Sequence, residues 1–214
     1  MRKTICILIA VMCLTTVFAA YAETEFILRG GIRFGDDMDT IGSKETWEKN
    51  SGFHIFNYKG TLTGIPAMLT YGYDDNHQMI SAMYCLNTRY DQDGGTIYAE
   101  NDAAFDEMLG NLRIKYGTVY LNDPDADVYT DIVLNEYTKY LSSSAASGQA
   151  NFESISECKS RAAWIVPDGE YYVLIDLRKY EIIQKGNLCY LILLDYCRFT
   201  EEEARKQSEI MSEL

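Results

Sequence analysis

The stretch IPAMLTYGYDDNHQMISAMYCLNT, residues 65–88, decides the fold of this chain. Two runs rich in Tyr, Met, Ile and Leu, Ile65–Tyr73 and Gln78–Thr88, flank the polar tetrapeptide Asp74–His77. Two strand-forming runs on either side of a short polar turn are typical of a β-hairpin. We therefore predict an antiparallel hairpin at this place.

A second hairpin is predicted further along the chain. Arg161–Val166 and Tyr171–Leu177 flank Pro167-Asp168-Gly169, a sequence with strong turn chemistry. The run Leu188–Tyr196 that follows is almost continuously apolar. Such a run is typical of a strand in the middle of a sheet, where both of its faces are covered.

The clearest helix is expected between Asp102 and Tyr116, and Gly117 stands where a helix-ending glycine belongs. Its apolar residues follow the spacing of one helix face, and they are Phe105, Met108, Leu109, Leu112 and Tyr116. Weaker signals predict five further segments: a strand at Phe26–Leu28, a helix from an Asp36 or Asp37 cap through Lys49, a strand at Phe53–Tyr58, a helix at Val128–Leu141 and a loop at Ser142–Asn151.

Together these elements predict an α+β fold, mostly an antiparallel sheet built from hairpins, with helices packed on one face. No repeat or Pro-rich linker divides the chain, so residues 23–214 are expected to form a single domain. Its last part, residues 200–214, begins with the capping box Thr200–Glu203 and reads as a polar C-terminal helix.

The first 22 residues have the pattern of a secretory signal peptide. Arg2 and Lys3 precede the apolar run Thr4–Phe18, and Ala20-Tyr21-Ala22 supplies small residues for a signal peptidase. Cleavage near Ala22 makes the protein secreted or extracytoplasmic. Cys13 is a weak lipoprotein signal, because it lies inside the apolar run and follows Met12.

The charge balance argues against nucleic acid as a partner. Asp and Glu number 32 against 19 Lys and Arg, a formal net charge of −13. Binding to a polyanion needs clustered cations that displace its counterions. No second apolar run is long enough to cross a bilayer, so we expect no membrane span. The oligomeric state is left open.

Four cysteines follow the predicted signal peptide: Cys85, Cys158, Cys189 and Cys197. An even number in an exported chain permits disulfides. If Leu188–Phe199 is one strand, Cys189 and Cys197 lie about 26 Å apart, at about 3.3 Å per residue, so any bridge must involve Cys85 or Cys158. Four free, buried thiols are the other interpretation.

The residues do not predict a metal, a cofactor or a catalytic group. Asp123, Asp125 and Asp127 alternate as in a calcium loop, but an EF-hand needs Gly and Glu where Val128 and Leu134 stand. The predicted mature chain has no Cys-x-x-Cys pair, and its histidines, His54 and His77, are isolated and precede every mature cysteine.

Tyrosine offers apolar area with a polar tip, which suits a binding surface, and the chain has 17 of them. Tyr71, Tyr73 and Tyr84 on the first hairpin are the candidate ligand-binding residues. Because tyrosine is also a favoured strand residue, the same side chains can instead belong to the core.

Four segments carry a resemblance to known proteins: Arg29–Asp36 before a helix, the hairpin Ile65–Tyr84, the helix end Leu112–Gly117, and Trp164–Leu177. Together they resemble uncharacterised secreted or envelope proteins of Gram-positive, gut-type bacteria. The opening is loosely similar to small outer-membrane assembly lipoproteins and to the β-lactamase inhibitor protein fold, which are interaction modules. This resemblance implies no functional residues.

We therefore interpret the chain as a secreted or cell-surface binding module for a protein, peptide or glycan ligand. The alternative is a small extracellular hydrolase that uses carboxylates we cannot identify.

The signal-peptide prediction is tested directly on protein secreted by the native host. We expect intact mass and N-terminal sequencing to give a chain that starts near Glu23 and carries no lipid. An acylated Cys13 at the N-terminus would contradict both the cleavage site and the free, unanchored state.

Overall fold

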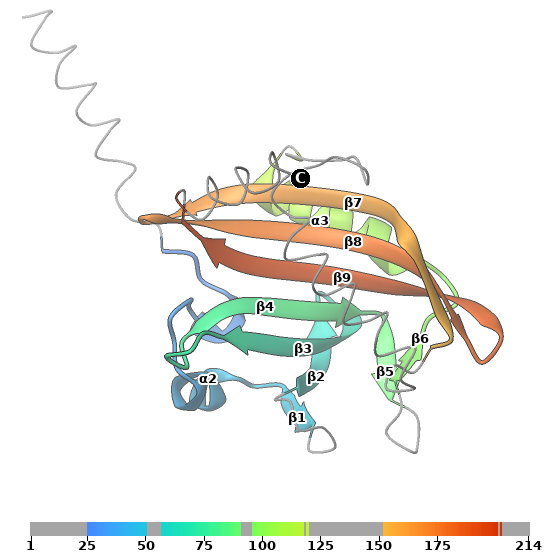
Figure 1. The fold of residues 1–214 in the computed structure, drawn as a ribbon, viewed down its shortest axis with the longest axis horizontal. Coiled ribbons are helices and arrows are strands. Elements are labelled where there is room, and N and C mark those ends of the chain that lie inside the picture. Colours follow the sequence, from blue (N-terminus) through green and yellow to red (C-terminus); the bar gives the residue numbers. More distant parts are fainter. Residues whose placement is uncertain are drawn as a thin grey trace, which may run out of the picture.

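The computed structural model describes residues 25–50, 57–90, 96–117, 119, 152–200 and 202. Its main feature is a seven-stranded antiparallel sheet in the order β1-β2-β3-β4-β9-β8-β7 (Figure 1). These strands are β1 (Glu48–Asn50), β2 (Asn57–Leu62), β3 (Ile65–Tyr73), β4 (Met79–Leu86), β7 (Ser154–Asp168), β8 (Tyr171–Gln184) and β9 (Asn187–Phe199).

Both predicted hairpins are confirmed. In the first, β3 and β4 pair from Ala67↔Leu86 to Tyr73↔Met79, with the predicted turn between them. In the second, β7 and β8 meet at Asp168↔Tyr171 and run far beyond their predicted bounds. The strands β5 (Thr88–Tyr90) and β6 (Thr96–Tyr98) form a separate two-stranded sheet.

Strand β9 joins the two hairpins into one sheet, because it pairs with β4 on one side and β8 on the other. It follows β8 through Lys185-Gly186, whose φ values of 52° and 77° are those of a tight type I′ turn. The predicted central strand is thereby confirmed.

The alternation of side chains along β9 explains its continuous apolar run. Ile192 and Leu194 belong to a large core cluster, whereas Leu191 and Leu193 belong to a smaller one. Successive residues of a strand point to opposite faces of the sheet, so the two clusters lie on its two faces. Both faces of β9 are therefore buried.

Two α-helices lie in the described part of the chain, and both contribute to the large cluster. Helix α3 (Ala103–Tyr116) adds Phe105, Met108 and Leu112 to it, and it lies alongside β7 and β8 (Figure 1). Helix α2 (Met38–Lys44) adds Ile41. The apolar stripe predicted for α3 is confirmed, with Leu109 half-buried at its edge. Gly117, with φ 81°, caps the helix.

Helix α2 is shorter than predicted. Asp37 caps it as expected, with its carboxylate accepting a hydrogen bond from Thr40 N at 2.7 Å, but the helix ends at Lys44 and not at Lys49. Glu45 is extended and directs its carboxylate into a buried set of hydrogen bonds, and the chain then enters β1. Tertiary contacts thus end the helix five residues before its predicted end.

The predicted strand at Phe26–Leu28 is also wrong. Only an isolated bridge, Ile27↔Arg33, forms there, because the 3₁₀ turn η1 (Arg29–Gly31) reverses the chain at once. Several predicted segments lie wholly or largely outside the described residues: residues 1–22, 128–141, 142–151 and 200–214. Of the predicted strand Phe53–Tyr58, only Asn57 and Tyr58 are described, and they begin β2.

The packing of α3 gives a stability prediction. Leu112 is buried, whereas Ile114, on the same helix, is 87% exposed. We expect Leu112→Ala to lower the free energy of unfolding by about 2 to 5 kcal/mol, and Ile114→Ala to change it by less than about 0.5 kcal/mol. Urea unfolding of both variants decides this, and equal losses would contradict the packing described here.

Candidate functional site

The three tyrosines selected from the sequence lie in or against the core. Tyr71 and Tyr84 are only 3% and 2% exposed, and Tyr73 packs against the same large cluster. Burial raises the pKa of all three, that of Tyr73 to about 12. Tyr71 and Tyr84 therefore offer almost no surface to a ligand.

Tyr71 instead holds the buried carboxylate of Glu45. Its hydroxyl donates to Glu45 Oε2 at 2.6 Å, while Trp47 N donates to Oε1 at 2.7 Å and Arg29 forms an ion pair with the same oxygen. Burial favours the protonated acid, but the hydrogen bonds from Arg29, Tyr71 and Trp47 outweigh it and lower the pKa of Glu45. This cluster fastens the chain after α2 to β3.

All four predicted mature cysteines are free. Burial raises the pKa of Cys85 and of Cys197 to about 12, and it also raises the pKa of Cys158 and Cys189. A nucleophilic or metal-binding cysteine needs the thiolate, which these surroundings disfavour. The free-thiol interpretation of the sequence fits this arrangement.

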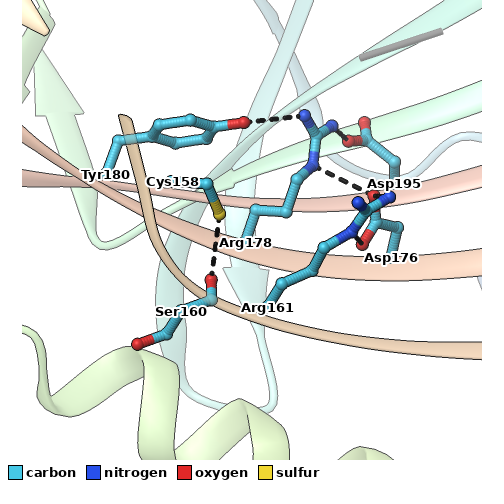
Figure 2. A network of polar contacts seen from close by, with 7 residues as sticks. All are labelled: Cys158, Ser160, Arg161, Asp176, Arg178, Tyr180 and Asp195. Atoms are coloured by element: carbon cyan, nitrogen blue, oxygen red, sulfur yellow. Dashed lines mark hydrogen bonds and ion pairs between the residues drawn. The ribbon is translucent and has the colours of Figure 1, made fainter. Parts of the chain in front are cut away.

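A buried network of four charges lies across β7, β8 and β9 (Figure 2). Asp176 is its centre: Arg161 Nε donates to Oδ1 at 3.0 Å, and Arg178 Nε lies 3.1 Å from Oδ2. Arg178 also forms an ion pair with Asp195 and donates to the Tyr180 hydroxyl at 3.0 Å. Two guanidinium groups thus balance two carboxylates.

The sheet register explains why both arginines are needed. Asp176 and Asp195 are directly opposite each other on neighbouring strands, and like charges in that position repel. Burial raises the pKa of Asp195, and Arg178 opposes this effect. Arg161, Asp176 and Arg178 are at most 3% exposed, so the network is closed to a ligand and its role is structural.

Two cavities lined by described residues are open to solvent and large enough to be considered as ligand sites. One, of about 490 Å³, lies beside β5 and β6 and is lined mainly by polar groups, including Asn87, Arg89 and Glu100. The other, of about 430 Å³, lies where the N-terminal segment meets the tip of the β7–β8 hairpin and the end of β9. This second cavity, called the hairpin-tip cleft below, is lined by Glu25, Phe26, Phe34, Asp168, Gly169, Glu170, Tyr171 and Arg198.

The N-terminal wall of the hairpin-tip cleft is fixed by backbone hydrogen bonds. Phe26 N donates to the Asp168 carboxylate at 2.6 Å, which fastens this segment to the hairpin turn. Gly35 N donates to Met79 O at 2.8 Å, and its φ of 89° is accessible mainly to glycine. The ring of Phe26 packs on Phe34 and Tyr196, so this wall continues into the core.

Arg198 is the most informative residue of the hairpin-tip cleft. The centre of its guanidinium group lies 4.3 Å from the ring centroid of Tyr171 and 5.8 Å from that of Phe34. A guanidinium group at such a distance from an aromatic ring is attracted by the ring's π electrons. Aromatic surface and a fixed positive charge are therefore presented together in an open cleft.

The sequence predicted the turn Pro167-Asp168-Gly169 but not the cleft beside it. Phe34, Tyr171 and Arg198 are far apart in the chain, and no short-range pattern connects them. The sequence feature that could have indicated the cleft is the glycine-rich segment before α2, whose turn brings Phe34 to the tip of the β7–β8 hairpin.

Comparisons of this chain with protein-family models, with curated proteins and with solved structures find no match. The resemblance to secreted and envelope proteins stays a prediction. In the described part of the chain, His, Cys, Asp and Glu side chains form no group of three or more suited to a metal. Nor does that part contain a helix with the length and apolar character needed to span a bilayer.

The charge network gives a matched pair of variants on β8. Asp176→Asn removes the carboxylate shared by two buried arginines, and we expect it to lower the free energy of unfolding by about 3 to 5 kcal/mol. Glu181 pairs with Lys159 at 3.7 Å on the surface, so Glu181→Gln should cost at most about 1 kcal/mol. If urea melts show similar losses of unfolding free energy for the two variants, the buried network stabilises the fold no more than a surface ion pair does.

The lowered pKa of Glu45 predicts a pH dependence. A carboxyl group whose pKa is lower in the folded than in the unfolded chain stabilises the fold above its unfolded pKa, about 4.3, and this stability is lost as the pH falls through the folded pKa. At pH 7 we expect Glu45→Gln to be about 1 to 3 kcal/mol less stable than the wild type.

Urea melts between pH 7 and pH 3 should show this difference shrinking at the acid end. The other carboxyl groups titrate in both proteins and largely cancel in the comparison. A difference that stays constant over the whole range would contradict the hydrogen bonds assigned to Glu45.

Proposed function

We propose that the protein is a secreted or cell-surface binding module whose ligand occupies the hairpin-tip cleft. The observation that carries the proposal is Arg198, whose guanidinium group lies against two aromatic rings in a cleft open to solvent. Its volume, about 430 Å³, lies within the range of about 300 to 1,000 Å³ that is usual for small-ligand pockets.

The surroundings of the hairpin-tip cleft support this assignment. Tyr171, which lines the cleft, is 37% exposed, whereas its neighbour Tyr172 is not part of the lining and stacks on Phe199. Exposed tyrosine is enriched where proteins bind one another, because it offers apolar area and a hydroxyl at small cost in conformational entropy. We propose further that α2 and α3 cover one face of the sheet, so that the cleft opens where their cover ends.

The alternative hydrolase would need acids in the same place. Glu25, Asp168 and Glu170 line the hairpin-tip cleft, but Asp168 holds Phe26 N and Glu25 pairs with Arg33 at 3.1 Å. These contacts give two of the three carboxylates a structural partner. A binding role therefore accounts for more of the lining than a hydrolytic one.

Two tyrosines of nearly equal exposure test the proposal. The probes are a peptide array and a glycan array, screened with the full chain. We expect Tyr171→Ala, which changes the lining of the hairpin-tip cleft, to weaken binding of the captured probe about tenfold or more, and Tyr172→Ala to leave its Kd within about twofold.

Equal effects of the two changes, or no captured probe on either array, would contradict the proposal. Cleavage of a captured probe by the wild type that is lost in Glu170→Gln would favour the hydrolase. Circular dichroism of each variant verifies that the fold is intact.

A further inference from the structure

The guanidinium group of Arg198 lies against two aromatic rings, and among the described residues it forms no ion pair. Tyr171 and Phe34 lie against the group, and a side-chain carbon placed on Gly35 would lie 3.8 Å from one of its terminal nitrogens. The N–H donors of a guanidinium point outward in its plane. Because Arg198 lines the hairpin-tip cleft, these donors can meet an acceptor that enters it.

Within the described part of the chain, no carboxylate forms an ion pair with Arg198. The acids nearby are engaged elsewhere, Glu25 with Arg33 and Asp168 with Phe26 N. Glu170 is exposed on the rim, and no ion pair joins it to Arg198. Among the described residues that line the hairpin-tip cleft, Arg198 therefore has no carboxylate partner.

We propose that the hairpin-tip cleft binds the end of a peptide, with the C-terminal carboxylate of the peptide on Arg198. This inference rests on the proposed function and names its ligand. A planar guanidinium matches a carboxylate with two parallel hydrogen bonds, which gives geometric specificity as well as affinity. Capture of a terminal carboxylate is one of the recurring modes of peptide recognition.

The other charges of the hairpin-tip cleft limit which anion fits. Glu25, Asp168 and Glu170 repel a ligand with several negative charges more strongly than a ligand with one carboxylate. Glu170 is placed to accept from an N–H group or an ammonium group of the same ligand. The C-terminal end of a peptide carries a carboxylate for Arg198 and N–H groups for Glu170. The small volume of the hairpin-tip cleft suits the end of a peptide better than a long segment.

The test compares two pools of random tetrapeptides, one with free C-terminal carboxylates and one with the same sequences amidated. Binding to the full chain is measured by isothermal titration calorimetry and by ¹H–¹⁵N NMR. We expect the free-acid pool to bind, and amidation to weaken binding about ten- to hundredfold, because it removes the charge that Arg198 meets.

Three arginine variants make the test specific. Arg198→Gln should weaken free-acid binding by the same factor as amidation and should not weaken binding of amidated peptides further. Arg198→Lys keeps the positive charge but not the planar guanidinium group with its paired N–H donors. It should therefore recover only part of the affinity that Arg198→Gln loses. Arg113, exposed on α3, is the matched control, and Arg113→Gln should leave binding within about twofold.

Equal binding of free-acid and amidated pools would overturn this inference, and so would binding of acidic oligosaccharides but of no peptide. In either case a loss of binding in Tyr171→Ala would still support the hairpin-tip cleft as the binding site. The failure of the inference is thereby distinguished from the failure of the proposed function.

Discussion

The burial of β9 on both faces is the constraint on which the rest of the structure depends. Ile192, Leu193 and Leu194 are each 0% exposed, so three successive side chains are removed from water in opposite directions. A fully buried Leu or Ile side chain contributes about 1.5 to 3 kcal/mol relative to an exposed one. A shift of one residue in register would exchange the two faces, so the pairing of β9 with β4 and β8 is strongly specified.

That double burial makes polar side chains near β9 costly unless they are paired. Asp195 and Asp176 lie opposite each other on β9 and β8. Their negative charges are compensated by ion pairs with Arg161 on β7 and Arg178 on β8. A buried charge without a partner is far more destabilising than an apolar residue. We infer that these four charges also help to fix the register of the strands, because a strand shifted along its neighbour would separate the aspartates from the arginines. The end of β9 is less buried than its middle, and there Arg198 lines the hairpin-tip cleft.

The sequence predicted the parts of the fold that depend on local patterns. The turn at Asp74–His77, the stripe of α3 and the apolar run of β9 are all short-range signals, and the structure has each of them. The second hairpin is also present, but its turn is Gly169-Glu170, because the predicted turn residues Pro167 and Asp168 still pair within β7. The end of α2 was predicted wrongly because Glu45 meets Arg29 and Tyr71 through tertiary contacts. The hairpin-tip cleft was missed for the same reason, since Phe34, Tyr171 and Arg198 meet only once the sheet has formed. Tyr71 and Tyr84 show the converse: residue type alone does not separate a core tyrosine from a binding one.

The proposed binding site depends directly on the fold. The central strand β9 ends at the hairpin-tip cleft, and a hydrogen bond from Phe26 N to Asp168 holds the N-terminal segment beside it. The most direct measurement is a map of backbone amide shifts in ¹H–¹⁵N NMR spectra as free-acid tetrapeptides are added. We predict that the shifted amides cluster in residues 25–35, at the turn 168–171 and around Arg198. Shifts confined to the other cavity, around Asn87, Arg89 and Glu100, would contradict the assignment of the binding site.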